Sequence, residues 1–290
     1  MGTTWSARIV DAPPHCAGVI HSILAHVIGE MSNWEAGSDV SRFNGAPVGA
    51  WVTLPDNLLC VLRAGLDVAR MSEGAFDPAI GRMIGTWGFG PPGARGEPAL
   101  HPSSAPWRSI DVEPGRARRR SDVQLDLSGI AKGFAVDAVA RALLDLGVQH
   151  FLIEIGGELR GAGVKPDLQP WWVDVETPPG LSLPALRIAL CGLSVATSGD
   201  YRRFAMEDGV RLSHSIDPAS GAPVANDVAS VTVLHESAML ADAWATAIMV
   251  MGHDRGMALA TREGLAVRLI RRQGDKGQEY MTPALAAMLD

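Results

Sequence analysis

The feature that most constrains the fold is the stretch "SAMLADAWATAIMVMG", residues 237–252. Between its two end residues only Asp242 and Thr246 are polar, and the other side chains are Ala, Met, Leu, Trp, Ile or Val. Such a segment predicts a helix that is packed into a core. An ionised carboxylate in these surroundings costs several kcal/mol unless it is paired. The fold must therefore bring a partner to Asp242.

Two kinds of partner fit this pattern. Asp242 and Thr246 are four residues apart, so they lie on one face of the helix and can meet a common ligand. A carboxylate and a hydroxyl suit a hard cation such as Mg²⁺, which takes oxygen ligands. Alternatively, Asp242 pairs with an arginine and Thr246 bonds to its own helix backbone. These two residues alone leave both interpretations open.

Composition restricts the class of protein. The chain has 290 residues, of which 47% are hydrophobic, and a formal net charge of -7, so a large core fits and a nucleic-acid surface is not suggested. The three cysteines form no Cys-x-x-Cys pair, which supports neither a disulfide framework nor a thiolate metal site. The opening segment has no signal-peptide core, and no apolar run is long enough for a membrane span. We therefore expect a cytoplasmic protein.

Segments with helical and with strand periodicity are intermixed along the chain, which predicts an α+β fold with mixed sheets and helices. Besides 237–252, helices are expected in 15–36, 55–74 and 130–147. Strands are expected in 3–10, 109–115, 123–129, 151–157, 171–178, 186–199, 228–236 and 265–272. The arginine-rich run 116–120 fits a solvated hairpin arm, because no aromatic residues alternate with its arginines.

Short polar clusters stand at the ends of several apolar runs, where small residues let a ligand approach the backbone. Asp77 precedes Pro78 in "GAFDPAIG" and is either a turn former or an acceptor for a donor-rich ligand. In "LDLSGIAKGF", Ser128 either caps a helix or, with Lys132 and backbone N–H groups, binds an anion. "TSGDYRRF" is either an anion cluster or the start of a helix, and His214 precedes an Asp-Pro turn. The chain has no P-loop, no G-x-G-x-x-G after a strand and no H-E-x-x-H helix.

Nine clusters follow one another in a characteristic order: "MGTTW", "MSNWEAGSDVSRFN", "GAFDPAIGRMIGTWGFG", "LDLSGIAKGFAVDAVA", "IEIGGELRGAG", "WWVDVETP", "VATSGDYRRF", "HSIDPASGAPV" and "ADAWATAIMVMG". In this order they resemble the ApbE family of FAD:protein FMN transferases, from Met1 to about Leu269. The resemblance implies an α+β fold with two lobes, similar to a T-fold, in a single domain over residues 1–290. It places the FAD site between the lobes.

The resemblance also implies a set of site residues. Mg²⁺ would be held by Asp242 and Thr246 with backbone oxygens of Ala131 and Ala245. His214 matches a family histidine near the reacting phosphates, and either His214 or Asp242 would accept the proton of the incoming hydroxyl. Trp34 stands where the family often has Tyr. The residues expected to contact the flavin nucleotide are Met1, Trp34, Ala75, Phe76, Asp77, Ser128, Lys132, Phe134 and Ile216.

The activity that the resemblance implies is a Mg²⁺-dependent cleavage of the FAD pyrophosphate. FMN is transferred through a phosphoester to a Ser or Thr of a target flavoprotein, and AMP is released. A FAD pyrophosphatase that uses water, and a non-catalytic FAD-binding protein, are the two alternatives. The presence of Asp242, Thr246 and His214 favours an enzyme. Many relatives look like exported lipoproteins, whereas this chain starts at the "MGT" motif, which favours a cytoplasmic target.

Overall fold

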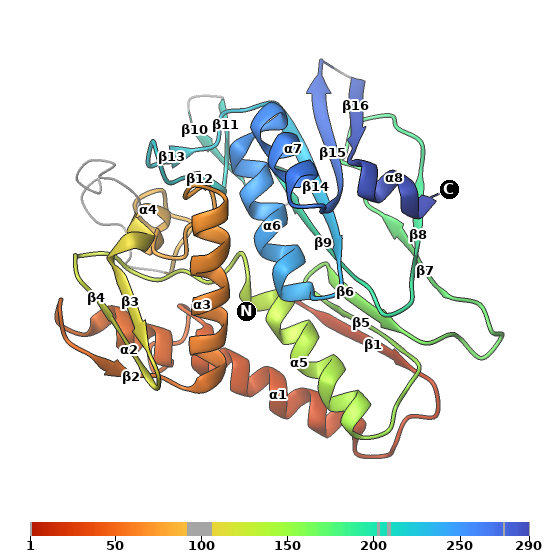
Figure 1. Ribbon diagram of the computed structural model, residues 1–290, viewed down its shortest axis with the longest axis horizontal. Helices are drawn as coiled ribbons and strands as arrows, with labels where there is room; N and C mark the ends of the chain where they lie inside the picture. Colours follow the sequence, from red (N-terminus) through yellow and green to blue (C-terminus); the bar gives the residue numbers. More distant parts are fainter. Residues whose placement is uncertain (1, 92–105, 202–203, 208–209, 275, 290) are drawn as a thin grey trace. The chain divides into compact units, whose positions relative to one another are not determined.

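The computed structural model describes residues 2–91, 106–201, 204–207, 210–274 and 276–289. Within these limits the chain forms two compact units, each assembled from separate segments. The first contains segments 26–131 and 203–225, and the second contains 2–25, 132–202 and 226–290. The first expectation from the sequence, helices and sheets intermixed, is confirmed (Figure 1).

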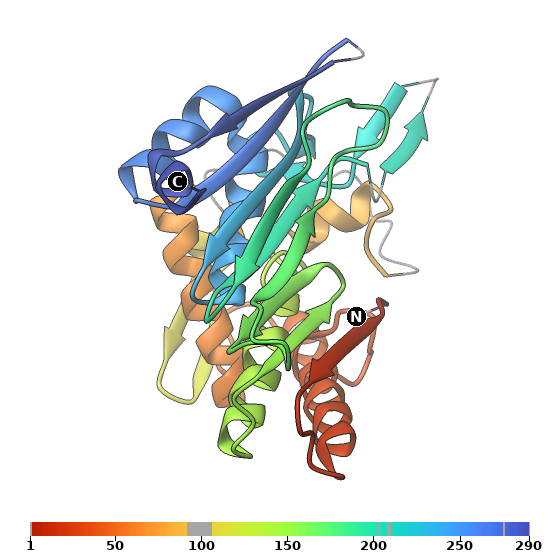
Figure 2. The same cartoon turned by 90° about the vertical axis from the view of Figure 1, so that its right-hand side faces the viewer.

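The second unit is built on a seven-stranded sheet whose neighbouring strands are all antiparallel. The strand order is β1-β5-β6-β9-β14-β15-β16, and Figure 2 shows these long strands from the side. Strand β14 is buried along nearly its whole length, as its run of Val, Ala and Leu requires. The strands are β1 (Trp5–Ile9), β5 (Phe151–Ile155), β6 (Glu158–Ala162), β9 (Ser194–Gly199), β14 (Val228–His235), β15 (Ala266–Gln273) and β16 (Lys276–Met281). A separate hairpin pairs β7 (Trp171–Val175) with β8 (Leu186–Leu190).

Helices cover this sheet. Helix α6 (Ala238–Met251) packs on β9 and β14, so the predicted buried helix is confirmed (Figure 1). It also packs against α7 (His253–Arg262), while α8 (Pro283–Leu289) packs on β15. Helix α5 (Ala131–Asp145) precedes β5 in the chain and is followed by Gly147, whose φ of 80° fits a glycine just after a helix end. Among the described residues, no helix is long and apolar enough to cross a membrane.

The first unit combines helices with small sheets. A three-stranded antiparallel sheet has the order β2-β4-β3, and two hairpins pair β10 with β11 and β12 with β13. The expected hairpin at the arginine run is confirmed, because β4 pairs with β3, but the arm is not solvated throughout, since Arg119 is buried. The strands are β2 (Val52–Thr53), β3 (Ile110–Glu113), β4 (Arg116–Arg119), β10 (Phe204–Glu207), β11 (Val210–Ser213), β12 (Ile216–Asp217) and β13 (Ala222–Pro223). The helices are α2 (Asp39–Gly45), α3 (Asp56–Met71), α4 (Gly81–Thr86) and the 3₁₀ helix η1 (Pro106–Ser109), and α1 (Cys16–Met31) ends in this unit.

Two strand predictions were wrong in detail. Segment 123–129 is not a strand, apart from an isolated bridge from Gln124 to Ile80. The side chain of Asn44 takes the place of a partner strand, because its amide accepts from Leu125 N–H and donates to Leu125 O. The expected strand 186–199 is two strands, interrupted at Gly192 with a φ of 77°. The other expected helices and strands are confirmed with shifts of a few residues at their ends.

Candidate functional site

Helix α6 is fixed at its first turn by hydrogen bonds from α5. Ser237 caps the helix through its Oγ, which accepts from Leu240 N–H. The Asp137 carboxylate on α5 accepts from Ser237 Oγ at 2.7 Å and from the N–H groups of Ala238 and Met239 at 3.0 Å. These bonds satisfy N–H groups that have no partner within the helix, and the negative charge suits a helix N-terminus. The carboxylate therefore sets where α6 begins relative to α5.

Arg160 on β6 holds the same carboxylate from the sheet. Its Nη1 donates to Asp137 Oδ1 and to the carbonyl oxygen of Glu236, each at 2.7 Å. One ion pair thus joins α5, β6 and the start of α6. Neither residue was predicted as a site residue, because an Asp and an Arg at these spacings look like ordinary surface charges. Both act as positioning residues for the helix that carries Asp242.

Helices α5 and α6 approach so closely that a glycine is required at position 133. A Cβ at this position would lie 2.2 Å from the carbonyl oxygen of Ala238 and 2.7 Å from Cα of Met239. The close approach lets Gly133 N–H donate to Asp242 Oδ2 at 3.1 Å. The glycine therefore gives Asp242 its backbone partner.

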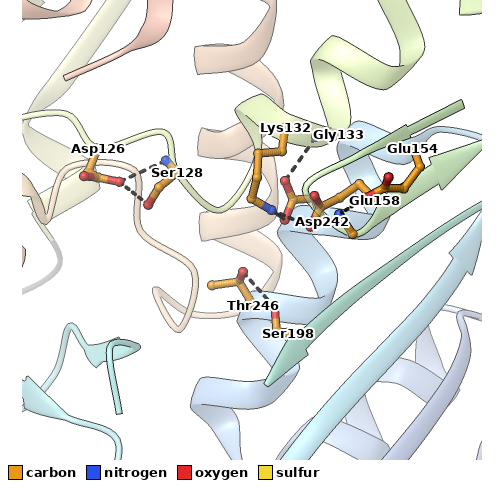
Figure 3. A network of polar contacts seen from close by, with 10 residues as sticks. Asp126, Ser128, Lys132, Gly133, Glu154, Glu158, Ser198, Asp242 and Thr246 are labelled. Carbon is orange, nitrogen blue, oxygen red and sulfur yellow. Dashed lines mark hydrogen bonds and ion pairs between the residues drawn. The ribbon is translucent and has the colours of Figure 1, made fainter. Parts of the chain in front are cut away.

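The charged partner of Asp242 is a lysine. Figure 3 shows the Lys132 side chain running from the first turn of α5 to the Asp242 carboxylate, where Nζ lies 3.4 Å from Oδ1. Asp242 itself is only 3% exposed. Lys132, which the resemblance assigned to the flavin nucleotide, is turned toward acidic side chains in the structure. The alternative prediction paired Asp242 with an arginine. Among the described residues its charged partner is Lys132 instead.

A second buried carboxylate, Glu158, shares the same lysine. Gly156 and Gly157, with φ of 65° and 104°, form the two-residue turn between β5 and β6 and place Glu158 at the start of β6. Its Oε1 accepts from Lys132 Nζ, and it is 2% exposed. Its Oε2 is buried without a hydrogen-bond partner in the described part of the chain. Glu158 belongs to the motif "IEIGGELRGAG", but its role was not predicted because it depends on sheet pairing.

When both carboxyl groups are ionised, the three side chains carry two negative charges and one positive charge, and burial acts on all of them. Burial raises the pKa of Asp242, although the Lys132 ammonium and the Gly133 N–H lower it. Burial lowers the pKa of Lys132, but the charges of Asp242 and Glu158 outweigh this effect and the pKa is raised. Burial raises the pKa of Glu158 to about 7, against the lowering effect of Lys132. One lysine therefore does not neutralise this buried cluster.

Thr246 lies one turn beyond Asp242 and points to the sheet. Its Oγ1 is 3.3 Å from Ser198 Oγ on β9, so the hydroxyl is held by another hydroxyl (Figure 3). Thr246 is half-buried and Ala245 is fully buried. The two predicted ligands Asp242 and Thr246 therefore lie on one helix, with one carboxylate oxygen and one hydroxyl oxygen on neighbouring turns.

This donor set fits a hard cation. It offers the oxygen atoms that Mg²⁺ takes as ligands, and the neighbouring Glu158 adds a second buried carboxyl group whose Oε2 has no partner among the described residues. Among the residues that the structure describes, no three His, Cys, Asp or Glu side chains converge on a metal position. A cation at Asp242 would therefore need the Thr246 hydroxyl and backbone oxygens as its other protein ligands.

In the first unit, Asp77 is a second buried carboxylate with quite different partners. Its Oδ1 accepts from Ala79 N–H at 2.8 Å and its Oδ2 from Trp107 N–H at 3.0 Å. Burial raises the pKa of Asp77 to about 7, although both backbone hydrogen bonds lower it. The neighbouring Phe76 is buried and Ala75 is half-buried. Asp77 thus acts as a turn former, one of its two predicted roles.

Ser128 belongs to a polar network in the first unit. Asp126 Oδ1 accepts from the N–H and from the Oγ of Ser128, and Asp126 Oδ2 accepts from Asn33 Nδ2 at 3.2 Å. Asn33 directly precedes Trp34, whose N–H donates to Ser32 Oγ and which is 53% exposed. The network therefore ties the loop that carries Trp34 to the loop that carries Ser128. Asn33 and Asp126 were not predicted as site residues.

The remaining predicted residues are found in several elements. His214 is half-buried, and its ring lies edge-on to Phe89 with a centroid distance of 6.4 Å. Ile216 is buried on β12, and Phe134 is half-buried on α5. Ala131 is the first residue of α5. Met1 and the arginines of "TSGDYRRF", Arg202 and Arg203, lie outside the described residues.

The chain matches known proteins over its whole length. The model of the ApbE family matches residues 1–269. A FAD:protein FMN transferase of Vibrio cholerae serotype O1 is 34% identical over 305 aligned residues, which cover 100% of this chain and 90% of that protein. A FAD:protein FMN transferase of Haemophilus influenzae is also 34% identical, and the alignment covers 94% of this chain and 84% of that protein.

A solved structure is similar as well. The apo form of the flavinyl transferase ApbE from Pseudomonas stutzeri superposes with a TM-score of 0.90 and 36% sequence identity, covering 99% of this chain and 94% of that one. The similarity thus includes the sheet, α5 and α6, from which the Asp242 cluster is built. The family match and the relatives together show that the chain belongs to the ApbE family.

Proposed function

We propose that this chain is a Mg²⁺-dependent FAD:protein FMN transferase. It would cleave the FAD pyrophosphate, attach FMN through a phosphoester to a Ser or Thr of a target flavoprotein and release AMP. The names of the relatives from Vibrio cholerae and Haemophilus influenzae support the reaction. The single observation in this chain that carries the proposal is the buried acidic cluster around Asp242, whose surplus charge suits a cation that a pyrophosphate also needs.

The cation would be held by Asp242 and Thr246, with backbone oxygens of Ala131 and Ala245 completing the set. Displacement at phosphorus develops charge on the phosphoryl oxygens and on the leaving AMP, so catalysis consists mainly of positioning and charge neutralisation. When bound, Mg²⁺ would supply part of that neutralisation. Asp242 is suited to this role because α5, β6 and the α6 cap hold it in one orientation.

Trp34, Asp77 and Ser128 are proposed contacts of the flavin nucleotide. Asp126 and Asn33 keep the Ser128 loop in place through the bonds described above. His214 would accept the proton of the incoming Ser or Thr hydroxyl, which must be lost as the phosphoester forms. A cytoplasmic location stays a prediction from the sequence. The further proposed contacts are Met1, Ala75, Phe76, Phe134 and Ile216, whereas Lys132, which the resemblance also assigned to the nucleotide, is paired with Asp242 and Glu158.

The test is to incubate the full chain with FAD, Mg²⁺ and a candidate flavoprotein domain, and to measure a covalent FMN adduct by mass spectrometry together with AMP. The proposal expects an adduct and AMP in equal amounts. His214→Ala should lose the adduct without losing Mg²⁺ binding, whereas Asp242→Asn should lose both. AMP and free FMN without an adduct for any tested domain would instead identify a FAD pyrophosphatase. Absence of AMP would contradict both enzymatic activities.

A further inference from the structure

The Lys132 ammonium is shared between two buried carboxylates. It lies 3.4 Å from Asp242 Oδ1 and makes its shorter contact with Glu158 Oε1. Asp242 Oδ2 accepts a hydrogen bond from Gly133 N–H, so Oδ1 is the oxygen of this carboxylate that faces the Lys132 ammonium. A cation that uses Oδ1 must therefore compete with Lys132.

Glu158 has the capacity to take the lysine over. Its Oε2 is buried and has no hydrogen-bond partner among the described residues, while Oε1 already contacts Nζ. Lys132 is a flexible four-carbon side chain with three donors and can move between acceptors without moving the helix. The position of Glu158 after the Gly156-Gly157 turn is fixed by pairing between β5 and β6. The sheet thus provides a fixed second acceptor beside a movable cation.

We propose that Lys132 and Glu158 form an internal counter-ion device that sets the affinity of the cation at Asp242. Without the metal, Lys132 divides its charge between Asp242 and Glu158, which keeps two buried carboxylates from repelling each other. With the metal, Lys132 passes fully to Glu158 and leaves Oδ1 to the cation. Lys132 and Glu158 are positioning residues in this device. The inference rests on the proposed function, because it requires the cation to bind at Asp242.

The device predicts opposite effects for its two members. In Glu158→Gln the lysine keeps Asp242 as its only charged partner, so Mg²⁺ should bind on the order of tenfold more weakly. In Lys132→Met the competitor is gone and the second carboxylate remains, so Mg²⁺ should bind on the order of tenfold more tightly. A double variant, Lys132→Met with Glu158→Gln, has the net charge of the original cluster and should lie between the two. A purely structural role of the pair would instead weaken binding in both single variants.

The experiment titrates the full chain with Mg²⁺ alone, without FAD, and follows the thermal unfolding midpoint and the binding heat. Lys165→Met and Glu263→Gln are matched controls, because they make the same charge changes at the exposed Lys165–Asp167 and Arg262–Glu263 pairs. Both controls should keep the affinity of the original chain. If Lys132→Met does not fold, the effect of removing Lys132 on Mg²⁺ affinity can still be measured by comparing the double variant with Glu158→Gln.

Failure of the inference differs from failure of the proposed site. Asp242→Asn should abolish Mg²⁺ binding, and an unchanged affinity in that variant would overturn the metal site itself. If Asp242→Asn abolishes binding while Glu158→Gln and Lys132→Met behave like the controls, the counter-ion device alone is overturned. Weaker binding in both single variants would also overturn it. Opposite shifts in the two variants would support it.

Discussion

Two aspartates, one in each compact unit, are almost equally buried but are stabilised in different ways. Asp77 is 4% exposed and binds the N–H groups of Ala79 and Trp107, with no charged partner among the described residues. Asp242 is 3% exposed and shares Lys132 with Glu158. Burial raises the pKa of both carboxyl groups. The first accepts hydrogen bonds from the backbone of its own turn and of η1, and the second belongs to a cluster in which one lysine serves two carboxyl groups.

The comparison teaches which property of a buried carboxylate points to a cation. Burial alone does not, because burial raises the pKa of both carboxyl groups, and the two backbone hydrogen bonds of Asp77 offset only part of that effect. A surplus of charge together with an unpaired oxygen does, as at Glu158 Oε2. The environments also differ in origin. Asp77 is held within a short turn and by η1, whereas the Asp242 cluster needs α5, β6 and α6 at the same time.

The largest expected effect comes from disturbing the contact between α5 and α6 that positions Asp242. Gly133→Ala should destabilise the chain by several kcal/mol, because its Cβ would overlap the Ala238 carbonyl at 2.2 Å and force α5 and α6 apart. Gly18→Ala in α1 is the control, since a Cβ there meets no atom within 4 Å and alanine favours helix by about 1 kcal/mol. Urea unfolding measures both. Equal effects of the two substitutions would contradict the close helix approach.

The pH dependence of the unfolding free energy tests whether Asp77 is buried with a raised pKa. Its pKa of about 7 in the folded chain lies above the ordinary value of 3.8, so the folded state holds the extra proton between these values. Stability should therefore fall as pH rises through this window, by about 1.4 kcal/mol per pH unit, and level off above pH 7. Asp77→Asn removes this contribution. Urea unfolding of both proteins at several pH values measures it, and parallel curves would contradict the burial of an ionisable Asp77.

A smaller effect concerns the start of α6. Asp137→Ala removes the acceptor of Ser237 Oγ and of two helix N–H groups and leaves Arg160 without its carboxylate, which should cost about 2 kcal/mol. Because α6 also carries Asp242, Mg²⁺ affinity should fall with it. Asp137→Asn keeps an acceptor and should recover part of both losses. Loss of stability with unchanged Mg²⁺ affinity would show that the cap does not position Asp242.

The smallest expected effect is at Ser198. Ser198→Ala removes the hydroxyl 3.3 Å from Thr246 Oγ1, with a cost below about 1 kcal/mol in unfolding free energy. Thr246 would then be less well oriented, so Mg²⁺ affinity should fall slightly. Thr197→Ala is the matched control, because Thr197 bonds to Thr232 rather than to α6. Calorimetric titration with Mg²⁺ distinguishes the two, and identical affinities would remove Ser198 from the site.

The helical part of the site could be predicted from the sequence, since periodicity and spacing depend only on local residues. The buried helix with Asp242 and Thr246 on one face is confirmed, as is the helix that begins near Lys132. Glu158 could not be predicted, because its place depends on pairing between β5 and β6 and on the direction of the Lys132 side chain. Asp137 and Arg160 could not be predicted for the same reason, because their ion pair joins elements that are distant in the sequence. The strand expected at 123–129 failed because Asn44, about eighty residues earlier, bonds to its backbone.

The most direct test of the central claim compares the two aspartates in one titration. Asp242→Asn and Asp77→Asn make the same chemical change at equally buried positions, and Mg²⁺ is added to each full chain while the unfolding midpoint is measured. We expect Mg²⁺ to raise the midpoint of the original chain and of Asp77→Asn, and to have no effect on Asp242→Asn. A midpoint that still rises in Asp242→Asn would contradict the assignment of the cation to α6.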